Sequence, residues 1–352
     1  MAIAHKQKGF IMEKLVTAVI GVGPMGVRHL QGAINYGSEI GAICDTDLER
    51  LRKVGEENGI PIEKQTTDYM DIVNNKEINA VILATPDQLH REQVENLLKA
   101  GKHIMCEKPL ALVREDIDAI VRAVEAHPEC TFMIGQICRF TPAFVKAKEL
   151  VAAGRIGELY FVESEYAHDY KHMFDHDPKN WRSDPVRHGV VGGGCHAVDL
   201  LRWIVNDDPI EVFAYGTHKL LPDVKYDDAT VSLLKFPGNV MGKVFVSTGC
   251  KRNYTMRTVL YGTKGTLIFD NTSSTMDFYE TDENGNTKPV QVIEIQVNNH
   301  NANEEYAAFA NVLLNGAKLV MPVYEGAKTV AACLAIVESS VKGEAVKPDY
   351  NF

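Results

Sequence analysis

Two residues of the sequence lie where proton transfer could occur. Lys108 directly follows an apolar run that ends at Glu107, and His196 comes two residues after three consecutive glycines. Open α/β sheets bind ligands at the carboxyl ends of their parallel strands, and burial or a neighbouring cation lowers the pKa of an ammonium group. Imidazole exchanges protons near neutral pH. Both are therefore candidate acid–base groups. The alternatives are a solvated lysine and a capping or core histidine.

A glycine-rich segment nearer the amino terminus has the spacing of a dinucleotide-binding loop. It follows an apolar run and opens a helical pattern, which is the context that G-x-G-x-x-G requires. The first glycine allows a tight turn, the second lets backbone approach a pyrophosphate, and the third lets helix and strand pack closely. The helix start then offers free N–H groups to phosphates. The residues expected to bind the cofactor here are Gly21, Gly23, Pro24, Met25 and Gly26.

The acidic partner of such a loop is Asp45, which ends the second expected strand. A carboxylate there accepts hydrogen bonds from the ribose hydroxyls of NAD and repels the 2′-phosphate of NADP. Thr46 and Asp47 follow instead of a basic residue, so NAD is favoured over NADP. The alternatives are a plain glycine turn and a helix cap, and the capping role fits Asp47 better than Asp45.

The elements that must position these residues fall into two groups. Up to about residue 155, continuously apolar runs alternate with helical patterns, which predicts a doubly wound parallel sheet. After residue 157, longer strands follow one another through short turns, which predicts an α+β domain with a large, open, mostly antiparallel sheet. The strands expected in the first part are 15–21, 40–45, 80–85, 103–107 and 131–135. Those expected in the second are 159–166, 211–217, 229–236, 240–247, 255–261, 266–269 and 290–297.

Composition limits the class of protein. The 352 residues suggest two domains at roughly 100–200 residues each. A formal charge of −10 without a Lys/Arg cluster argues against nucleic acid as a partner. No apolar run reaches membrane-helix length, so no membrane partner is expected. The seven cysteines are scattered, which favours reduced thiols in the cytoplasm.

Further motifs resemble the glucose–fructose oxidoreductase, inositol dehydrogenase and rhizopine catabolism (Gfo/Idh/MocA) family. Members carry a T-P-[ND]-x-x-H turn, matched here from Thr85 and Pro86 to His90, and an E-K-P segment, matched by Glu107, Lys108 and Pro109. Other matches are Arg139-Phe140 with Pro142, Trp181-Arg182, the segment 194–199 and the turn 262–265. Together the matches cover about residues 14–345.

This resemblance implies a Rossmann domain, a tightly held nicotinamide cofactor and substrates that are sugars, cyclitols or their derivatives. We therefore predict an NAD-binding Rossmann domain at 14–138 and a substrate-binding and oligomerisation domain at 139–352, after an extension at 1–13. A terminal helix near 323–341 is expected to pack back on the first domain. The open sheet of the family often packs against another subunit, which implies a homodimer or homotetramer.

The resemblance also assigns roles to single residues. Lys108 is the lysine that bonds the reacting hydroxyl, His196 is the catalytic histidine, and Pro109 follows a cis bond in many members. The residues assigned to the cofactor beyond the glycine loop are Thr85, Pro86, His90, Glu107, Pro109 and Arg139. One departure stands out: sugar and inositol dehydrogenases of the family commonly have Asp four residues before the histidine, where this chain has Gly192. Asp199, one helical turn after His196, is expected to orient that histidine or the substrate.

Substrate specificity is expected to come from the second domain. The segment 168–177 is dense in hydrogen-bonding and aromatic side chains, a mixture that suits sugars. The residues assigned to the substrate are Lys108, Tyr170, His172, Trp181, Arg182, His196 and Asp199. His168, His172 and His176 recur every four residues beside Asp175, which allows a metal interpretation. No second ligand cluster supports it, and no metal is predicted.

These observations favour an NAD-dependent dehydrogenase that oxidises a secondary ring hydroxyl, at C3 for instance, of a sugar, glycoside or cyclitol. A second interpretation is a redox-neutral NAD-dependent glycoside hydrolase. It would act through a 3-keto intermediate and β-elimination, with Tyr170 or His172 as the second base. A third is an NAD sensor without catalysis, against which the presence of both Lys108 and His196 argues.

Overall fold

Six parallel strands form the first sheet, in the order β3-β2-β1-β4-β5-β6. The strands are β1 (Val16–Ile20), β2 (Glu39–Cys44), β3 (Gln65–Thr66), β4 (Ala80–Leu83), β5 (His103–Glu107) and β6 (Phe132–Gly135). The central strand β4 is buried on both faces, which explains its continuous apolar sequence. The strand order reverses between β1 and β4, so the predicted doubly wound sheet is confirmed.

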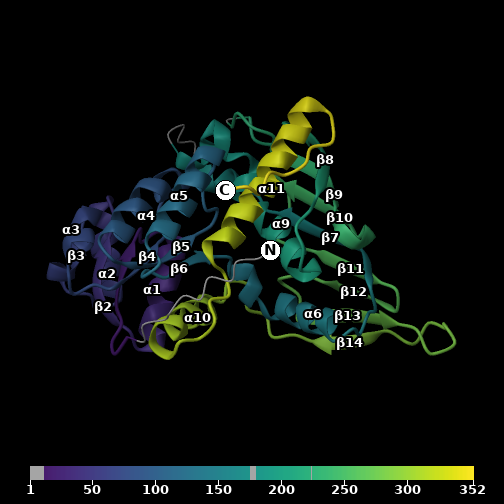
Figure 1. Cartoon of the computed structure of the whole chain (residues 1–352), viewed down its shortest axis with the longest axis horizontal. Helices are drawn as coiled ribbons and strands as arrows, with labels where there is room; N and C mark the ends of the chain where they lie inside the picture. Colours follow the sequence, from purple (N-terminus) through teal and green to yellow (C-terminus); the bar gives the residue numbers. More distant parts are fainter. Residues whose placement is uncertain (1–11, 175–179, 223) are drawn as a thin grey trace. The chain divides into compact units, whose positions relative to one another are not determined.

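The helices of this sheet lie on its two faces. Figure 1 shows α4 and α5 on one face and α1 with α10 on the other. The helices are α1 (Pro24–Tyr36), α2 (Leu48–Glu57), α3 (Tyr69–Asn74), α4 (His90–Lys99), α5 (Arg114–Ala126) and α10 (Ala302–Asn315). The computed structural model describes residues 12–174, 180–222 and 224–352. None of the helices in these ranges is long and apolar enough to cross a bilayer.

The chain divides into two compact units. The first holds the described residues up to Gly135 together with 302–327 and Phe352, and the second holds 136–301 and 328–351. This division differs from the expected continuous domain at 139–352, because α10 belongs to the first unit. The hydroxyl of Tyr306 in α10 lies 2.6 Å from Oγ1 of Thr17 in β1. A local sequence pattern cannot show which sheet a helix packs against.

Eight strands form the sheet of the second unit, in the order β14-β13-β12-β11-β7-β10-β9-β8. The strands are β7 (Leu159–Ala167), β8 (Glu211–Thr217), β9 (Ala229–Lys235), β10 (Met241–Ser247), β11 (Thr258–Gly262), β12 (Gly265–Phe269), β13 (Thr275–Glu280) and β14 (Gln291–Glu294). Only the β7–β10 pair is parallel, so the predicted mostly antiparallel sheet is confirmed. The sequence did not predict β3, α3 or β13.

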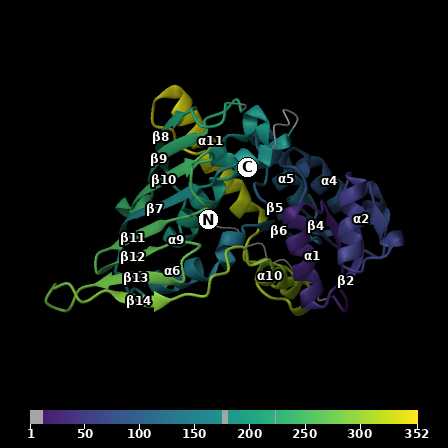
Figure 2. The same cartoon turned by 180° about the vertical axis from the view of Figure 1, so that it is seen from behind.

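Helices cover one face of this sheet. They include α6 (Pro142–Ala152), α7 (Lys171–Phe174), α8 (Gly189–Gly192), α9 (Cys195–Val205) and most of α11 (Val323–Lys342). Figure 2 shows α6 and α9 on the same side of the strands. On the opposite side, called the open face here, Tyr215, Leu233 and Met241 are 65%, 56% and 55% exposed. Successive side chains of these strands therefore point alternately to the packed face and to the open face, where the three named side chains are exposed and apolar.

Candidate active site

The loop between β1 and α1 has the backbone that a dinucleotide requires. Gly21 has φ 87°, and a Cβ on it would lie 2.4 Å from the carbonyl oxygen of Ala84. A Cβ on Gly26 would lie 1.8 Å from the carbonyl oxygen of Gly21. Gly23, in contrast, has only Arg50 Nη1 nearby, at 3.9 Å, and no side chain caps α1. The first N–H groups of α1 therefore fit a pyrophosphate, as predicted for NAD.

A hydrogen bond joins the carboxylate of Asp45 to this loop. Its Oδ2 accepts a hydrogen bond from Val22 N at 3.0 Å, and its Oδ1 accepts one from Asp47 N at 2.9 Å. Arg50 Nη1 lies 3.9 Å from the same carboxylate. Asp47 caps α2 by accepting from Arg50 N at 3.0 Å, which confirms that the cap is Asp47. The carboxylate of Asp45 thus stands beside the loop at the end of β2, where a ribose is expected.

His90 connects the turn after β4 with the segment after β5. Its side chain is buried, with Nδ1 3.0 Å from the carbonyl oxygen of Pro109 and Nε2 3.3 Å from that of Thr85. Thr85 Oγ1 donates to Gln93 at 2.6 Å. Both nitrogens of His90 thus face backbone carbonyls. In this position His90 supports the turn that begins at Pro86, and the cofactor contact that the resemblance assigns to His90 stays a prediction.

The end of β5 carries Glu107, Lys108 and Pro109, joined by the expected cis Lys108–Pro109 bond. Oε2 of Glu107 accepts a hydrogen bond from Lys108 N at 3.0 Å. Burial raises the pKa of Glu107, but the hydrogen bond from His29 and the charges of His29 and Lys108 outweigh burial and hold that pKa below its usual value. The carboxylate form therefore anchors the backbone of half-buried Lys108.

Two residues near Glu107 escaped the sequence analysis. Nε2 of His29, in α1, lies 2.6 Å from Oε1 of Glu107, and Nδ1 lies 4.0 Å from Oε2 of Glu305 in α10. Within the described ranges, these three residues are the one group with metal-ligating proximity. One ligand atom of each residue lies within 4.8 Å of those of the other two. No local sequence signal connects residues so far apart.

In the second unit, His196 lies in a buried cluster of rings. Its Nδ1 is 3.4 Å from Cys138 Sγ, and its ring stacks on Tyr166 with centroids 6.0 Å apart. The hydroxyl of Tyr166 lies 2.8 Å from that of Tyr170. Tyr254 packs on Tyr166 at 5.4 Å between centroids. Burial holds the pKa of Tyr166 and Tyr254 well above the usual value, so both phenols stay neutral.

Of this ring cluster, only His196 and Tyr170 are predicted from the sequence. Tyr166 resembles any other strand residue, and Tyr254 lies in a loop segment with no motif around it. His172 is exposed at the start of α7, with its ring centroid 6.1 Å from that of His168. His176 and Asp175, from the metal interpretation, lie outside the described residues.

Trp181 and Arg182 lie in a short 3₁₀ turn, Trp181–Ser183. Guanidinium groups cover the Trp181 ring, with Arg182 Cζ 4.2 Å and Arg187 Cζ 4.8 Å from its centroid. The indole ring of Trp181 is therefore in contact with two cationic side chains. A Cβ on Gly192 would lie 2.3 Å from Nη1 of Arg187. The guanidinium of Arg187 therefore occupies the space that the side chain of the family's aspartate would need at position 192.

Arg139 and Asp199 pair with each other. Arg139 donates to Asp199 from Nε at 2.9 Å and from Nη2 at 2.7 Å. Thr329 in α11 donates to the same carboxylate at 2.9 Å, and Arg202 lies 3.5 Å away. Asp199 is fully buried. Arg139 and Asp199 therefore form a buried ion pair, while the contact of Arg139 with cofactor and that of Asp199 with substrate stay predictions.

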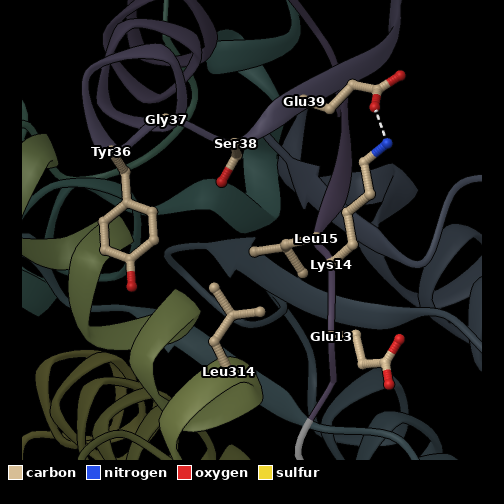
Figure 3. Close-up of a pocket in the computed structure, with 8 residues that line it drawn as sticks. All are labelled: Glu13, Lys14, Leu15, Tyr36, Gly37, Ser38, Glu39 and Leu314. Carbon is tan, nitrogen blue, oxygen red and sulfur yellow. Dashed lines mark ion pairs between the residues drawn. The ribbon is translucent and has the colours of Figure 1, made fainter.

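A cavity of about 330 Å³ lies elsewhere in the first unit. Figure 3 shows its lining, including the ion pair of Lys14 with Glu39. It opens beside Leu15, just before β1, and Glu39, at the start of β2. Parallel sheets bind ligands at the carboxyl ends of their strands, so this cavity lies at the wrong edge for the candidate site.

The doubly wound sheet, its glycine loop and Asp45 define a dinucleotide-binding protein. Residues 15–136 match the model of the oxidoreductase family with an NAD-binding Rossmann fold, and residues 144–268 match that of the GFO/IDH/MocA C-terminal domain. The chain belongs to the Gfo/Idh/MocA family of oxidoreductases. Its first domain is an NAD-binding Rossmann domain.

Individual relatives agree with this assignment. Myo-inositol 2-dehydrogenase of Thermotoga maritima is 30% identical over 284 residues, covering 76% of this chain and 78% of the relative. An uncharacterized oxidoreductase of Bacillus subtilis is 28% identical over 286 residues, covering 77% and 80%. The structure of levoglucosan dehydrogenase with NADH superposes with a TM-score of 0.85 at 22% identity, covering 96% of this chain and 100% of that one. The last likeness concerns the fold.

Proposed function

We propose that the chain oxidises a secondary ring hydroxyl of a small sugar, glycoside or cyclitol, with NAD as the oxidant. Support comes from relatives named inositol 2-dehydrogenase and from the site itself. The observation that carries the proposal is the anchoring of Lys108 at the carboxyl end of β5, where Glu107 accepts its backbone N–H at 3.0 Å. A lysine fixed at this edge of an NAD-binding sheet suits proton exchange with a substrate.

Each group has a distinct role in this proposal. NAD, when bound, accepts the electron pair of the breaking C–H bond. The glycine loop holds its pyrophosphate, and Asp45 holds its adenosine ribose. Lys108 bonds the reacting hydroxyl and takes its proton, while His196 serves as the second proton carrier.

The second unit supplies groups that suit a polyol. Tyr170 and Tyr254 each pack on Tyr166, whose ring stacks on His196. Near Trp181, Arg182 and Arg187 add cationic hydrogen-bond donors. Sugars combine polar edges with apolar ring faces, so this mixture matches them. For a pyranose, we propose C3 as the first position to test, because a 3-ketone would also serve the hydrolase alternative.

The test is NADH formation, followed by absorbance, with myo-inositol, glucose, and alkyl and aryl glucosides. Sustained NADH growth with one of them is expected, together with its loss in Lys108→Ala. Lys99→Ala, at the exposed end of α4, is the matched control and should retain activity. Release of an aryl aglycone without NADH would replace the dehydrogenase with the redox-neutral glycoside hydrolase.

We also propose that the chain assembles as a homodimer or homotetramer through the open face. The exposed apolar residues Tyr215, Leu233 and Met241 support this proposal.

A further inference from the structure

His29, Glu107 and Glu305 form a group called the buried acid cluster here, of which the proposed function uses only Glu107. The side chains of His29 and Glu305 have no exposed surface, and that of Glu107 is 8% exposed. One imidazole stands between two carboxyl groups, 2.6 Å from Glu107 and 4.0 Å from Glu305. The cluster therefore connects further proton carriers to Glu107, the residue that adjoins Lys108.

Glu305 is the unusual member of the cluster. Within the described part of the chain, neither of its carboxyl oxygens has a hydrogen-bond partner, and neither does Nδ1 of His29. Burial, reinforced by the charge of Glu107, raises the pKa of Glu305 well above its usual value. A buried carboxyl group without a partner lowers stability, so a structural role alone does not explain it.

Lys108 acts on both carboxyl groups. Its ammonium group attracts their negative charge and thereby lowers the pKa of Glu107 and of Glu305. Linkage is reciprocal, so each carboxylate also stabilises the ammonium form of Lys108. The titratable groups that face Glu305 are His29 from α1, and Glu107 and Lys108 from the end of β5.

We propose that Glu305 is a positioning residue that passes its proton to His29 and so becomes a carboxylate that stabilises the ammonium group of Lys108 formed during the reaction. In the resting protein, Glu305 holds its proton and Nε2–H of His29 donates to Glu107. Glu305 thus stays neutral while Lys108 is an amine. The inference rests on the proposed role of Lys108 as the group that takes the substrate proton.

In the proposed step, the hydroxyl O–H bond breaks and an N–H bond forms on Lys108. The C–H bond breaks as the hydrogen leaves with its electron pair, as a hydride for which bound NAD would be the acceptor. A rotation of Glu305 closes its 4.0 Å gap to His29, its O–H bond breaks, and an N–H bond forms at Nδ1. The new carboxylate faces the new ammonium group, and the proton stays within the cluster.

The pH dependence of turnover tests this proposal. In Glu305→Gln, the amide cannot release a proton, so kcat should fall about tenfold, and the acidic limb should move about one pH unit lower. The KM for substrate should not change, because the cluster does not touch it. Tyr306→Phe is the matched control on the same helix, since its hydroxyl bonds Thr17 and Ser38 instead, and its profile should match the wild type. A wild-type kcat and profile in Glu305→Gln would overturn the inference.

Infrared spectroscopy of the resting protein gives a second readout, independent of turnover. The C=O stretch of a protonated carboxylic acid should appear in the wild type at neutral pH and be absent from Glu305→Gln. Identical spectra would overturn the inference. Failure of the wild type to oxidise any tested polyol would refute the proposed function instead, and the infrared band would still report the proton on Glu305.

Discussion

At the residue scale, Asp45 is expected to decide between the two nicotinamide cofactors. Its carboxylate stands beside the glycine loop and lies 3.9 Å from Arg50. Asp45→Ser removes the charge that repels a 2′-phosphate and leaves Arg50 beside it. We expect the ratio of kcat/KM with NAD to that with NADP to fall roughly tenfold or more, equivalent to about 1.4 kcal/mol.

Asp47→Ser is the control for this experiment. A serine still caps α2, and the substitution also removes an ion-pair partner of Arg50 at 2.7 Å. If this variant alone changed the cofactor ratio while Asp45→Ser did not, Asp45 would have no part in selecting NAD.

The raised pKa of Glu305 also predicts how the stability of the protein depends on pH. Its pKa in the folded chain is raised above the ordinary 4.5 because it is buried beside the charge of Glu107. A carboxyl group whose pKa is raised by folding makes its full contribution to stability below the pKa that it has in the unfolded chain. This contribution is lost as the pH rises through the pKa that the group has in the folded chain. Between these two pKa values, the wild type should therefore lose about 1.4 kcal/mol of unfolding free energy per pH unit relative to Glu305→Gln. Urea denaturation of both proteins at a series of pH values measures this slope, and parallel curves would contradict it.

At the element scale, Gly193 lets the turn between α8 and α9 pack on β7. A Cβ there would lie 2.3 Å from the Tyr170 hydroxyl and 2.5 Å from Cε1 of Tyr166. Gly193→Ala should lower the free energy of unfolding by about 1–3 kcal/mol, since buried rings must move. In a Tyr170→Phe background the same substitution should cost less, because the nearest atom is gone. Equal costs in urea denaturation would show that this contact does not limit the turn.

Asp199 joins three elements of the second unit. It lies in α9 and accepts hydrogen bonds from Arg139 and from Thr329 of α11. Asp199→Asn removes the negative charge that faces the buried guanidinium groups of Arg139 and Arg202, so the free energy of unfolding should fall by about 3 kcal/mol or more. Asp208→Asn, on a more exposed partner of Arg202, should cost less. If the Asp199→Asn protein were stable but had a raised KM for substrate, Asp199 would contact the substrate as the sequence predicts.

Local patterns account for most of the elements and only part of the site. The strands of the first sheet are predictable because burial on both faces demands continuous apolar runs, as in 80–83. The two-residue β3 is too short to leave a pattern. The partnership of His29 with Glu107 and Glu305 depends on tertiary packing of α1, β5 and α10. No spacing rule connects such distant residues.

At the scale of the whole molecule, the open face predicts self-association. Tyr215 pairs with Val231 across β8 and β9, and Lys235 pairs with Met241 across β9 and β10, so these side chains share one surface with Leu233. Monomeric proteins rarely expose broad apolar patches, and a stable interface buries about 800 Å² per partner. A second copy of this sheet would cover such a surface.

The substitution Leu233→Glu, combined with Tyr215→Glu, places two charges on this surface, on strands β9 and β8, without touching the packed face. Burying unpaired like charges in a symmetric contact is costly, so the wild-type oligomer should dissociate to monomers. Light scattering during size-exclusion chromatography measures the mass, and circular dichroism checks that the fold persists. Leu48→Glu, on a leucine that is 53% exposed in α2, is the matched control and should leave the oligomer intact. An unchanged mass in the double variant would place the interface elsewhere on the molecule.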